Sequence, residues 1–278
     1  MKKIETLIED IHKVFSEPHE FDEGRVEAFG KRLAQAIASK INPTQGKPTL
    51  RMSNLGTKCN RQLWYKINKP GDGEKLSVET RIKFLFGHIL EEMLLFLAEE
   101  AGHTVTGTQD TVELEGIVGH RDAIIDGVLV DAKSASSMAY KKFKSGLKYE
   151  DDAFGYLTQL NAYLEASKDD PLLVEKDRAG FLVIDKQFGH ICLDMHKKSD
   201  MDHHKIALLK KDAVAAPEAP YRGYTDEEDG KSGNRKLGTA CGYCDYKKTC
   251  WPNLRTFIYS SGHRFLTRVE RLPDVPEE

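Results

Sequence analysis

The chain has 278 residues, of which 40% are hydrophobic and 31% are charged, so it can bury a substantial core and is not disordered throughout. Its formal net charge of −3 excludes a uniformly basic nucleic-acid binder, although a few well-placed cations in a local cleft are enough to bind phosphates. The sequence lacks an apolar run of about 18 residues, and acidic residues interrupt its N-terminal segment, which predicts a cytoplasmic protein with neither a membrane span nor a secretory signal.

Two amphipathic helices are predicted in the first forty residues, because apolar side chains recur there at spacings of three and four. These side chains are Ile4, Leu7, Ile8, Ile11, Val14 and Phe15, then Val26, Phe29, Leu33 and Ile37. Asn42-Pro43 is expected to end the second helix. Ser53 is expected to cap a short helix that contains Cys59, and a Gly/Pro-rich turn at 70–73 closes this part of the chain.

A long helix is predicted from Val78 to Ala101, with His88 and Glu91 on one face. From about residue 105 the apolar period changes to two, which predicts consecutive strands at 111–114, 117–125 and 128–132. Asp126-Gly127 is a strong hairpin signal between the last two strands. The alternation of strands with helices then continues, with a helix at 154–167, strands at 180–184 and 190–195, and a helix at about 201–215.

The hairpin brings two aspartates together. Folding the chain back at 126 and 127 places Asp122 opposite Asp131, where paired side chains come within about 4.5 to 5.5 Å of each other. Lys133 lies two residues beyond Asp131 and therefore faces the same way, while the Ala132 carbonyl is left as a further oxygen ligand. By itself, a hairpin with two aspartates and a lysine is as often an ordinary polar face of a sheet.

Two carboxylates and a lysine in this arrangement suit the hydrolysis of a phosphodiester. Mg²⁺ prefers oxygen ligands, and an added His88 would favour Mn²⁺. One or two such ions activate water, orient the in-line attack and neutralise charge on the phosphate and the leaving oxygen. The ammonium group of Lys133 can position the attacking water or stabilise charge in the transition state.

Five cysteines are unevenly distributed, which favours metal ligation in a reducing compartment over a disulfide framework. Cys241, Cys244 and Cys250 lie within ten residues, Cys59 lies far upstream, and Cys192 is the expected spare. Four thiolates can hold Zn²⁺ in a tetrahedral site or a 4Fe-4S cluster, and the spacing alone does not separate these two cofactors.

Taken in order, these motifs resemble the PD-(D/E)XK nuclease superfamily, and in particular its RecB-like iron-sulfur exonuclease branch, which includes Cas-four-like proteins and AddB-type nuclease domains. The matching segments are Gly87-His88 with Glu91, Gly119-His120-Arg121-Asp122, Asp131-Ala132-Lys133, Gln159-x3-Tyr163 and the cysteines, with one cysteine before the nuclease core and three after it. The resemblance extends from about residue 53 to residue 251.

This resemblance implies an α/β fold with a restriction-endonuclease-like core, in which a mixed central sheet is flanked by helices. The expected segments are an N-terminal helical segment at 1–75, the nuclease core at 76–216, a cysteine-cluster segment at 217–271 and a disordered tail at 272–278. It also implies that His88, Asp122 and Asp131 ligate the metal, that Lys133 is catalytic, and that Gln159 and Tyr163 contact the DNA or the site. A 4Fe-4S cluster on the four cysteines is then favoured over zinc.

The expected function is a Mg²⁺- or Mn²⁺-dependent DNA exonuclease that acts on single-stranded DNA ends, with 5′ to 3′ polarity implied by the resemblance alone. The chain has no phosphate-binding loop of the Gly-x4-Gly-Lys-Ser/Thr type, so unwinding requires a helicase partner or an already open substrate. A recombination or CRISPR-adaptation protein is an alternative partner. Two alternative functions are a DNA-binding module with weak or no cleavage and a structure-specific endonuclease with a four-cysteine zinc site.

Overall fold

The computed structural model describes residues 2–41 and 47–278. Along the chain the elements are α1 (Leu7–Ser16), α2 (Glu23–Ile41), α3 (Asn60–Asn68), α4 (Val78–Glu100), β1 (Val105–Thr106), β2 (Thr111–Leu114), β3 (Ile117–His120), β4 (Ala123–Ile125), β5 (Val128–Ala135), α5 (Ser137–Lys144), α6 (Tyr156–Ala166), β6 (Arg178–Asp185), β7 (Ile191–Lys197), α7 (His203–Ala215), β8 (Glu227–Glu228), β9 (Arg235–Lys236), α8 (Thr239–Gly242), α9 (Lys247–Cys250), β10 (Arg255–Tyr259) and β11 (Gly262–Arg268). None of the helices in these two ranges is long and apolar enough to cross a membrane.

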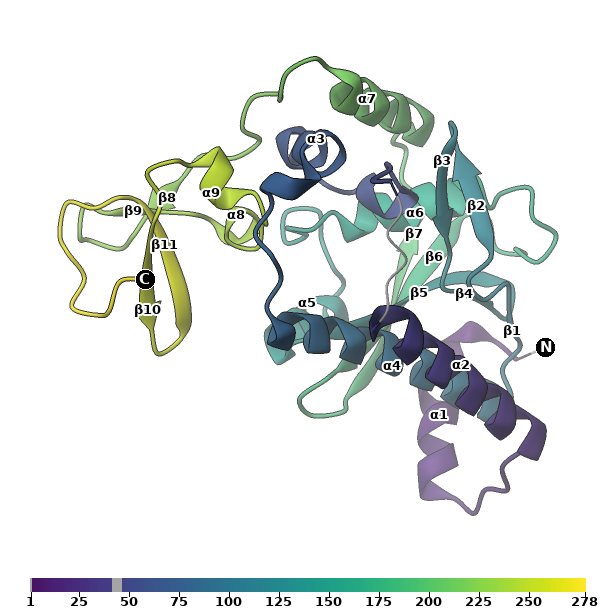
Figure 1. The fold of residues 1–278 in the computed structure, drawn as a ribbon. Helices are drawn as coiled ribbons and strands as arrows, with labels where there is room; N and C mark the ends of the chain where they lie inside the picture. Colours follow the sequence, from purple (N-terminus) through teal and green to yellow (C-terminus); the bar gives the residue numbers. More distant parts are fainter. Residues whose placement is uncertain (1, 42–46) are drawn as a thin grey trace.

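The central sheet has the strand order β1-β4-β5-β6-β7 (Figure 1). Strands β5 and β6 run parallel, and every other neighbouring pair in this sheet is antiparallel. The parallel pair needs a long crossover, which α5 and α6 provide between the two strands. The predicted mixed sheet flanked by helices is therefore confirmed.

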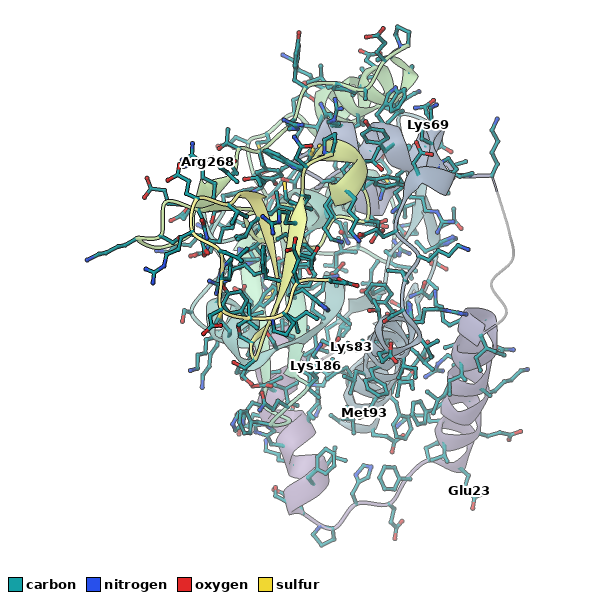
Figure 2. All side chains as sticks on the ribbon, turned by 60° about the vertical axis from the view of Figure 1, so that its left-hand side comes forward. Glu23, Lys69, Lys83, Met93, Lys186 and Arg268 are labelled. Atoms are coloured by element: carbon teal, nitrogen blue, oxygen red, sulfur yellow. The ribbon has the colours of Figure 1, made fainter. Side chains whose placement is uncertain are left out.

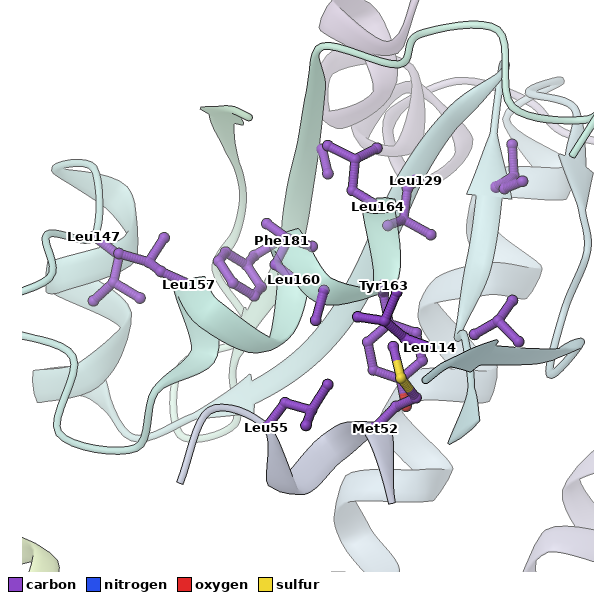
Figure 3. Close-up of a cluster of buried hydrophobic side chains, with 14 of the residues drawn as sticks. Met52, Leu55, Leu114, Leu129, Leu147, Leu157, Leu160, Tyr163, Leu164 and Phe181 are labelled. Carbon is purple, nitrogen blue, oxygen red and sulfur yellow. The ribbon is translucent and has the colours of Figure 1, made fainter. Parts of the chain in front are cut away.

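Two hydrophobic cores cover the two faces of this sheet, because alternate residues along β5 and β6 point to opposite sides. Leu129 and Phe181 pack on the side of α6, whereas Val130 and Leu182 pack on the side of α1 and α4. Figure 3 shows part of the first core, with Tyr163 of α6 beside Met52. Odd-numbered residues of β5, including Asp131 and Lys133, consequently face α6.

The predicted helices of the first hundred residues are confirmed, but the cap of the third one is not. Ser53 lies inside a short 3-10 turn, Met52–Asn54. The Asn54 side chain accepts a hydrogen bond from the Arg51 backbone N–H and stabilises this turn. Helix α3 instead begins after Cys59, whose side chain makes no capping hydrogen bond. The predicted end of α2 at Asn42-Pro43 lies outside the described residues.

The strand predicted at 117–125 is interrupted at Arg121 and Asp122, which separate β3 from β4. The Arg121 side chain is fully buried and forms ion pairs with Asp110 at 2.8 Å and Asp170 at 2.7 Å. A buried guanidinium must satisfy its donors, so the chain turns where this side chain enters the protein. As a result, β2 and β3 form a separate two-stranded sheet.

A small sheet near the C-terminus was not predicted. Its strand order is β10-β11-β9-β8, and it stands to the left of the central sheet in Figure 1. When the molecule is turned, Arg268 of β11 and Glu23 at the start of α2 lie at opposite ends (Figure 2). Strands β8 and β9 and helices α8 and α9 are two to four residues long, too short to produce a readable period.

The tail at 272–278 was predicted to be disordered, and this prediction is wrong. Ile258 donates a backbone hydrogen bond to Pro276 at 2.9 Å, and Glu278 donates one to Thr256 at 3.0 Å. Arg255 also forms a two-pronged ion pair with Glu277, with both N–O distances at 2.6 Å. The charged tail therefore pairs with β10 instead of extending into solvent.

One close backbone contact joins the first part of the chain to α6. Gly56 and Gly155 approach so closely that a Cβ atom on Gly56 would lie 2.0 Å from the Gly155 carbonyl oxygen. Gly155 also has a φ of 76°, in the left-handed region that favours glycine. Both positions therefore require glycine, and their contact fixes where α6 begins.

Candidate active site and cysteine pocket

The turn between β4 and β5 positions the first carboxylate. Asp126 and Gly127 have φ values of 50° and 81°, as a tight hairpin requires, and Ala123 pairs with Val130. Continuing this register places Asp122 opposite Asp131, as predicted. The Oδ2 atom of Asp122 accepts a hydrogen bond from the backbone N–H of Ala132 at 2.8 Å.

The lysine of the motif lies against the second carboxylate. Lys133 and Asp131 point to the same face of β5, and their side chains form an ion pair. The ammonium group of Lys133 also lies 5.4 Å from the centre of the Tyr156 ring, over its face. Sequence reasoning missed Tyr156, although its position at the first turn of α6, three residues before Gln159, could have indicated it.

Burial and negative neighbours dominate the electrostatics of Asp122. Burial raises the pKa of its carboxyl group well above the usual value, and the charges of Asp131 and Glu91 raise the pKa further. The ammonium of Lys133 and the hydrogen bond from Ala132 oppose this increase only in part. The negative charges of Asp131 and Glu91 thus repel that of Asp122, and a bound cation would relieve this repulsion.

Lys133 remains protonated in this setting. Burial would lower its pKa, but the two carboxylates of Asp131 and Asp122 outweigh burial and raise the pKa above the usual value. A charged ammonium can donate hydrogen bonds and stabilise negative charge, whereas it cannot accept a proton. The geometry therefore favours an electrostatic or water-positioning role for this side chain over general-base catalysis.

Helix α6 packs on the face of the sheet that carries Asp131 and Lys133, and it contributes the two predicted residues. The amide of Gln159 donates a hydrogen bond to the Oδ1 atom of Asp131 at 3.2 Å. Tyr163 is buried one turn further along, where burial, followed by the charges of Asp122 and Asp131, raises the pKa of its hydroxyl to about 12. Gln159 contacts the motif directly, and Tyr163 lies within the electrostatic field of both aspartates.

Helix α4 reaches the same centre from the other side. His88 Nδ1 lies 3.8 Å from a carboxylate oxygen of Glu91, and Glu91 accepts a hydrogen bond from Gln109 at 2.7 Å. All three side chains line one cavity together with Asp122. The structure therefore places His88 and Glu91 in a cavity with Asp122 and adds Gln109, whereas Asp131 and Lys133 do not line this cavity.

The donor set fits a hard divalent cation, since it consists of carboxylate oxygens and one imidazole. Asp122 and Asp131 come from adjacent strands, and Glu91 and His88 come from α4. Among the residues that the structure describes, no group of three or more His, Cys, Asp or Glu side chains is already gathered closely enough to hold an ion. The repulsion at Asp122 is the observation that points to a cation here.

The four predicted cluster cysteines meet at one pocket, although they come from distant parts of the sequence. Its lining comprises Cys59, Cys241, Cys244 and Cys250 with the side chains of Arg61, Gln62, Tyr65, Tyr224, Ala240, Tyr246, Lys247 and Trp251. The expected spare, Cys192, packs against the core on the α6 side of the central sheet instead. All five cysteines are free thiols in the structure.

These thiols affect one another electrostatically. Burial, together with the nearby sulfur atoms of Cys59 and Cys250, raises the pKa of Cys241 to about 11. Burial also raises the pKa of Cys244 to about 12, with Cys59 and Cys241 contributing in the same direction. The raised pKa values keep both groups as neutral thiols, and a metal centre held by the four sulfur atoms would have to displace their protons on binding.

Other contacts hold the two cysteine-bearing segments together. The Glu74 backbone N–H donates to the Asp245 carbonyl at 2.8 Å, and the Glu74 side chain forms an ion pair with Lys247. The rings of Tyr65 and Tyr246 stack with their centres 5.5 Å apart. The segment before the core and the segment after it therefore form one unit around the pocket.

Comparisons with known proteins leave the family open. No family model matches the chain, and no curated protein matches it. Solved structures do match, among them one described as "Crystal structure of SSO0001", with 16% identity, a TM-score of 0.46, and coverage of 80% of this chain and 95% of that chain.

Proposed function

We propose that this protein is a metal-dependent nuclease with a restriction-endonuclease-like core, acting on single-stranded DNA ends. The observation that supports it most strongly is the convergence of Asp122, Asp131 and Lys133 at the open side of the β4–β5 hairpin. The raised pKa of Asp122 adds to this support, because a carboxyl group with a perturbed pKa that lines a cavity is typical of functional sites.

In this proposal Asp122 and Asp131 hold Mg²⁺ or Mn²⁺, with His88 and Glu91 at the margin of the site. When bound, the cation supplies an activated water and neutralises charge on the phosphate. Asp122 is held in place by the Ala132 backbone N–H, and Asp131 by Gln159. Both carboxylates are thus oriented before any substrate arrives.

Lys133 would place a positive charge beside the reacting phosphate, whose pentacoordinate transition state gains negative charge on its oxygen atoms. Its ammonium is fixed between the Asp131 carboxylate and the face of the Tyr156 ring. An oriented cation in a partly dry site stabilises a transition state without reorganising during the reaction. Tyr163 and Gln159 then act as positioning residues from α6.

The test is cleavage of end-labelled single-stranded DNA, supplied in linear and circular forms with Mg²⁺ or Mn²⁺. Cleavage of linear DNA alone, reduced about 10²- to 10³-fold by Lys133→Ala, supports an exonuclease. Labels at the 5′ and 3′ ends then identify its polarity, which we propose to be 5′ to 3′. Cleavage of circles identifies an endonuclease. If neither metal supports cleavage, the nuclease proposal fails and the chain is a DNA-binding module.

For the cysteine pocket we propose a structural 4Fe-4S cluster, with Zn²⁺ as the alternative. Cys59, Cys241, Cys244 and Cys250 supply the four thiolates that either centre needs. The cluster would tie the segment before the nuclease core to the segment after it, so that metal binding contributes to folding. Iron and acid-labile sulfide analysis of anaerobically purified protein separates the two, since zinc would bring neither.

A further inference from the structure

A second cavity opens on the other side of Lys133, between the nuclease core and the cysteine segment. Its lining includes Lys133, Lys142, Phe154, Tyr156, Lys186 and Tyr243. These side chains come from β5, α5, the loop before α6, the first residue of α6, the residue after β6 and the segment between Cys241 and Cys244. The cavity is therefore assembled by distant parts of the chain, and it ends at the proposed catalytic lysine.

Aromatic rings form one wall of this cavity and remain open to solvent. The centres of the Phe154 and Tyr243 rings lie 6.0 Å apart at an interplanar angle of 68°, and the Phe154 and Tyr156 centres lie 5.7 Å apart. Phe154 is 46% exposed and Tyr243 is 76% exposed. Large apolar surfaces left in water at the edge of a cavity are typical of binding sites.

Lysines outnumber aspartates in the lining of this cavity, which includes Lys133, Lys142, Lys186, Asp151 and Asp152. Lys142 pairs with Asp151 at 3.8 Å, with both side chains exposed, and donates a hydrogen bond to the Asp151 carbonyl at 3.1 Å. The buried carboxylate of Asp152 accepts hydrogen bonds from the Gly155 and Leu157 backbone N–H groups. Among the described residues Lys186 forms no ion pair, and exposed rings beside such an ammonium group match the bases and phosphates of a single strand.

We propose that Phe154 and Tyr243 form a stacking site for a nucleobase of single-stranded nucleic acid, with Lys186 and Lys142 binding the adjacent phosphates. The strand would continue from this cavity to Lys133. This inference rests on the proposed function, because it supplies the approach to the same catalytic centre. It also assigns the cysteine segment a second task, since Tyr243 lies between two of the four pocket cysteines.

The probe is a fluorescein-labelled oligodeoxythymidine, with Ca²⁺ in place of Mg²⁺ to prevent cleavage and with binding followed by fluorescence anisotropy. Phe154→Ala and Tyr243→Ala should each weaken binding about 5- to 150-fold, the range for loss of one base–aromatic stack. Tyr243→Trp retains a stacking face and should bind within about twofold of the parent. Tyr221→Ala is the matched control, because its side chain is 97% exposed and lies outside both cavities.

Salt dependence separates the base contacts from the phosphate contacts. Lys186→Ala should reduce the slope of log K against log salt by about 0.7, whereas Tyr243→Ala should lower affinity at every salt concentration with the slope unchanged. An oligonucleotide with abasic sites should bind the parent as weakly as the normal strand binds Tyr243→Ala. A duplex of equal length should be insensitive to Tyr243→Ala, because its bases are already stacked.

The stacking site is overturned if Phe154→Ala and Tyr243→Ala bind the single strand as the parent does, or if Tyr221→Ala weakens binding equally. Thermal unfolding of each variant checks that the fold is kept, and Tyr243→Trp keeps the test valid should an alanine variant misfold. Cleavage with Mg²⁺ is measured separately. A parent that cleaves but is unaffected by these substitutions refutes the stacking site alone, whereas a parent that binds but never cleaves refutes the nuclease proposal.

Discussion

Gln159 and Asp131 are joined by a hydrogen bond of 3.2 Å from the side-chain amide to the Oδ1 atom, which connects helix α6 to strand β5. We predict that Gln159→Ala lowers nuclease activity or metal affinity about 10- to 100-fold, the usual effect of losing a group that orients a metal-binding carboxylate. Activity titrated against Mg²⁺ and Mn²⁺ measures this effect. If Gln159 only contacted DNA, KM for the DNA would rise and the metal titration would stay unchanged.

Asp122→Asn should stabilise the metal-free protein while abolishing cleavage. The raised pKa means that, above about pH 3.9, the folded state retains a proton that the unfolded chain releases. Stability therefore falls as the pH rises from that value to the raised pKa, and the penalty stays constant at higher pH. Asparagine carries no charge and can still accept the Ala132 hydrogen bond, so its advantage should be greatest at neutral and alkaline pH.

The measurement is the difference in Tm between the parent and Asp122→Asn across the pH range, in the absence of divalent ions. Each kcal/mol of relieved repulsion should raise Tm by about 2–4 °C for a domain of about 150–250 residues. Mg²⁺ or Mn²⁺ should then raise the Tm of the parent and leave that of the variant nearly unchanged. Equal metal responses in the two proteins would show that Asp122 does not bind the cation.

Lys133→Ala should reduce cleavage by about 10²- to 10³-fold, as loss of one preorganised charge at a reaction centre does. The matched control is Lys197→Ala, at the exposed end of β7, which should keep full activity. Initial rates on linear single-stranded DNA provide the readout. An unchanged rate in Lys133→Ala would show that Lys133 does not contribute to cleavage and would contradict the proposed mechanism.

Tyr156→Leu should lower kcat by about 2- to 30-fold, because the ammonium of Lys133 loses the ring beneath it and cation–π contacts contribute about 0.5–2 kcal/mol. Tyr156→Phe retains the ring and should retain the rate. If Tyr156→Phe were as slow as Tyr156→Leu, the hydroxyl group and not the ring of Tyr156 would support the reaction. Single-turnover cleavage separates this effect from product release.

Cys244→Ala should release the metal centre, lower the free energy of unfolding by about 4 kcal/mol or more, and weaken DNA binding more than it alters binding of the catalytic cation. Cys192→Ala is the control, since that thiol lies away from the pocket and its loss should leave the iron content unchanged. Iron content, thermal unfolding and DNA binding are measured for the parent, Cys244→Ala and Cys192→Ala. A Cys244→Ala protein as stable and active as the parent contradicts the structural role.

The sequence was sufficient to predict the parts of the site that depend on short-range patterns. Asp126-Gly127 predicted the hairpin that sets Asp122 opposite Asp131, and strand alternation predicted that Lys133 shares a face with Asp131. Both relations lie within one hairpin, where the backbone repeat alone decides which way a side chain points. The place of Gln159 at the site was implied by the resemblance to RecB-like nucleases, and its contact with Asp131 joins a helix to a strand.

Other features depended on contacts that the sequence pattern does not reveal. Tyr156 reaches Lys133 because α6 packs against the face of the sheet that carries Lys133. Arg121 interrupts a strand because its buried charge forms ion pairs with Asp110 and Asp170. The tail looked disordered because it is charged and rich in proline. It is ordered through backbone hydrogen bonds to β10, and hydropathy patterns carry no information about such bonds.

The contact between Gly56 and Gly155 has a consequence for tolerance to mutation. Any side chain at either position would force the start of α6 away from the segment that leads to Cys59, and Gln159 would move with that helix. A random screen for inactive variants should therefore recover both glycines alongside the charged residues of the site. Neither glycine has a side chain that could bind metal or DNA. Substituting either one would therefore reduce activity only by displacing α6 and Gln159.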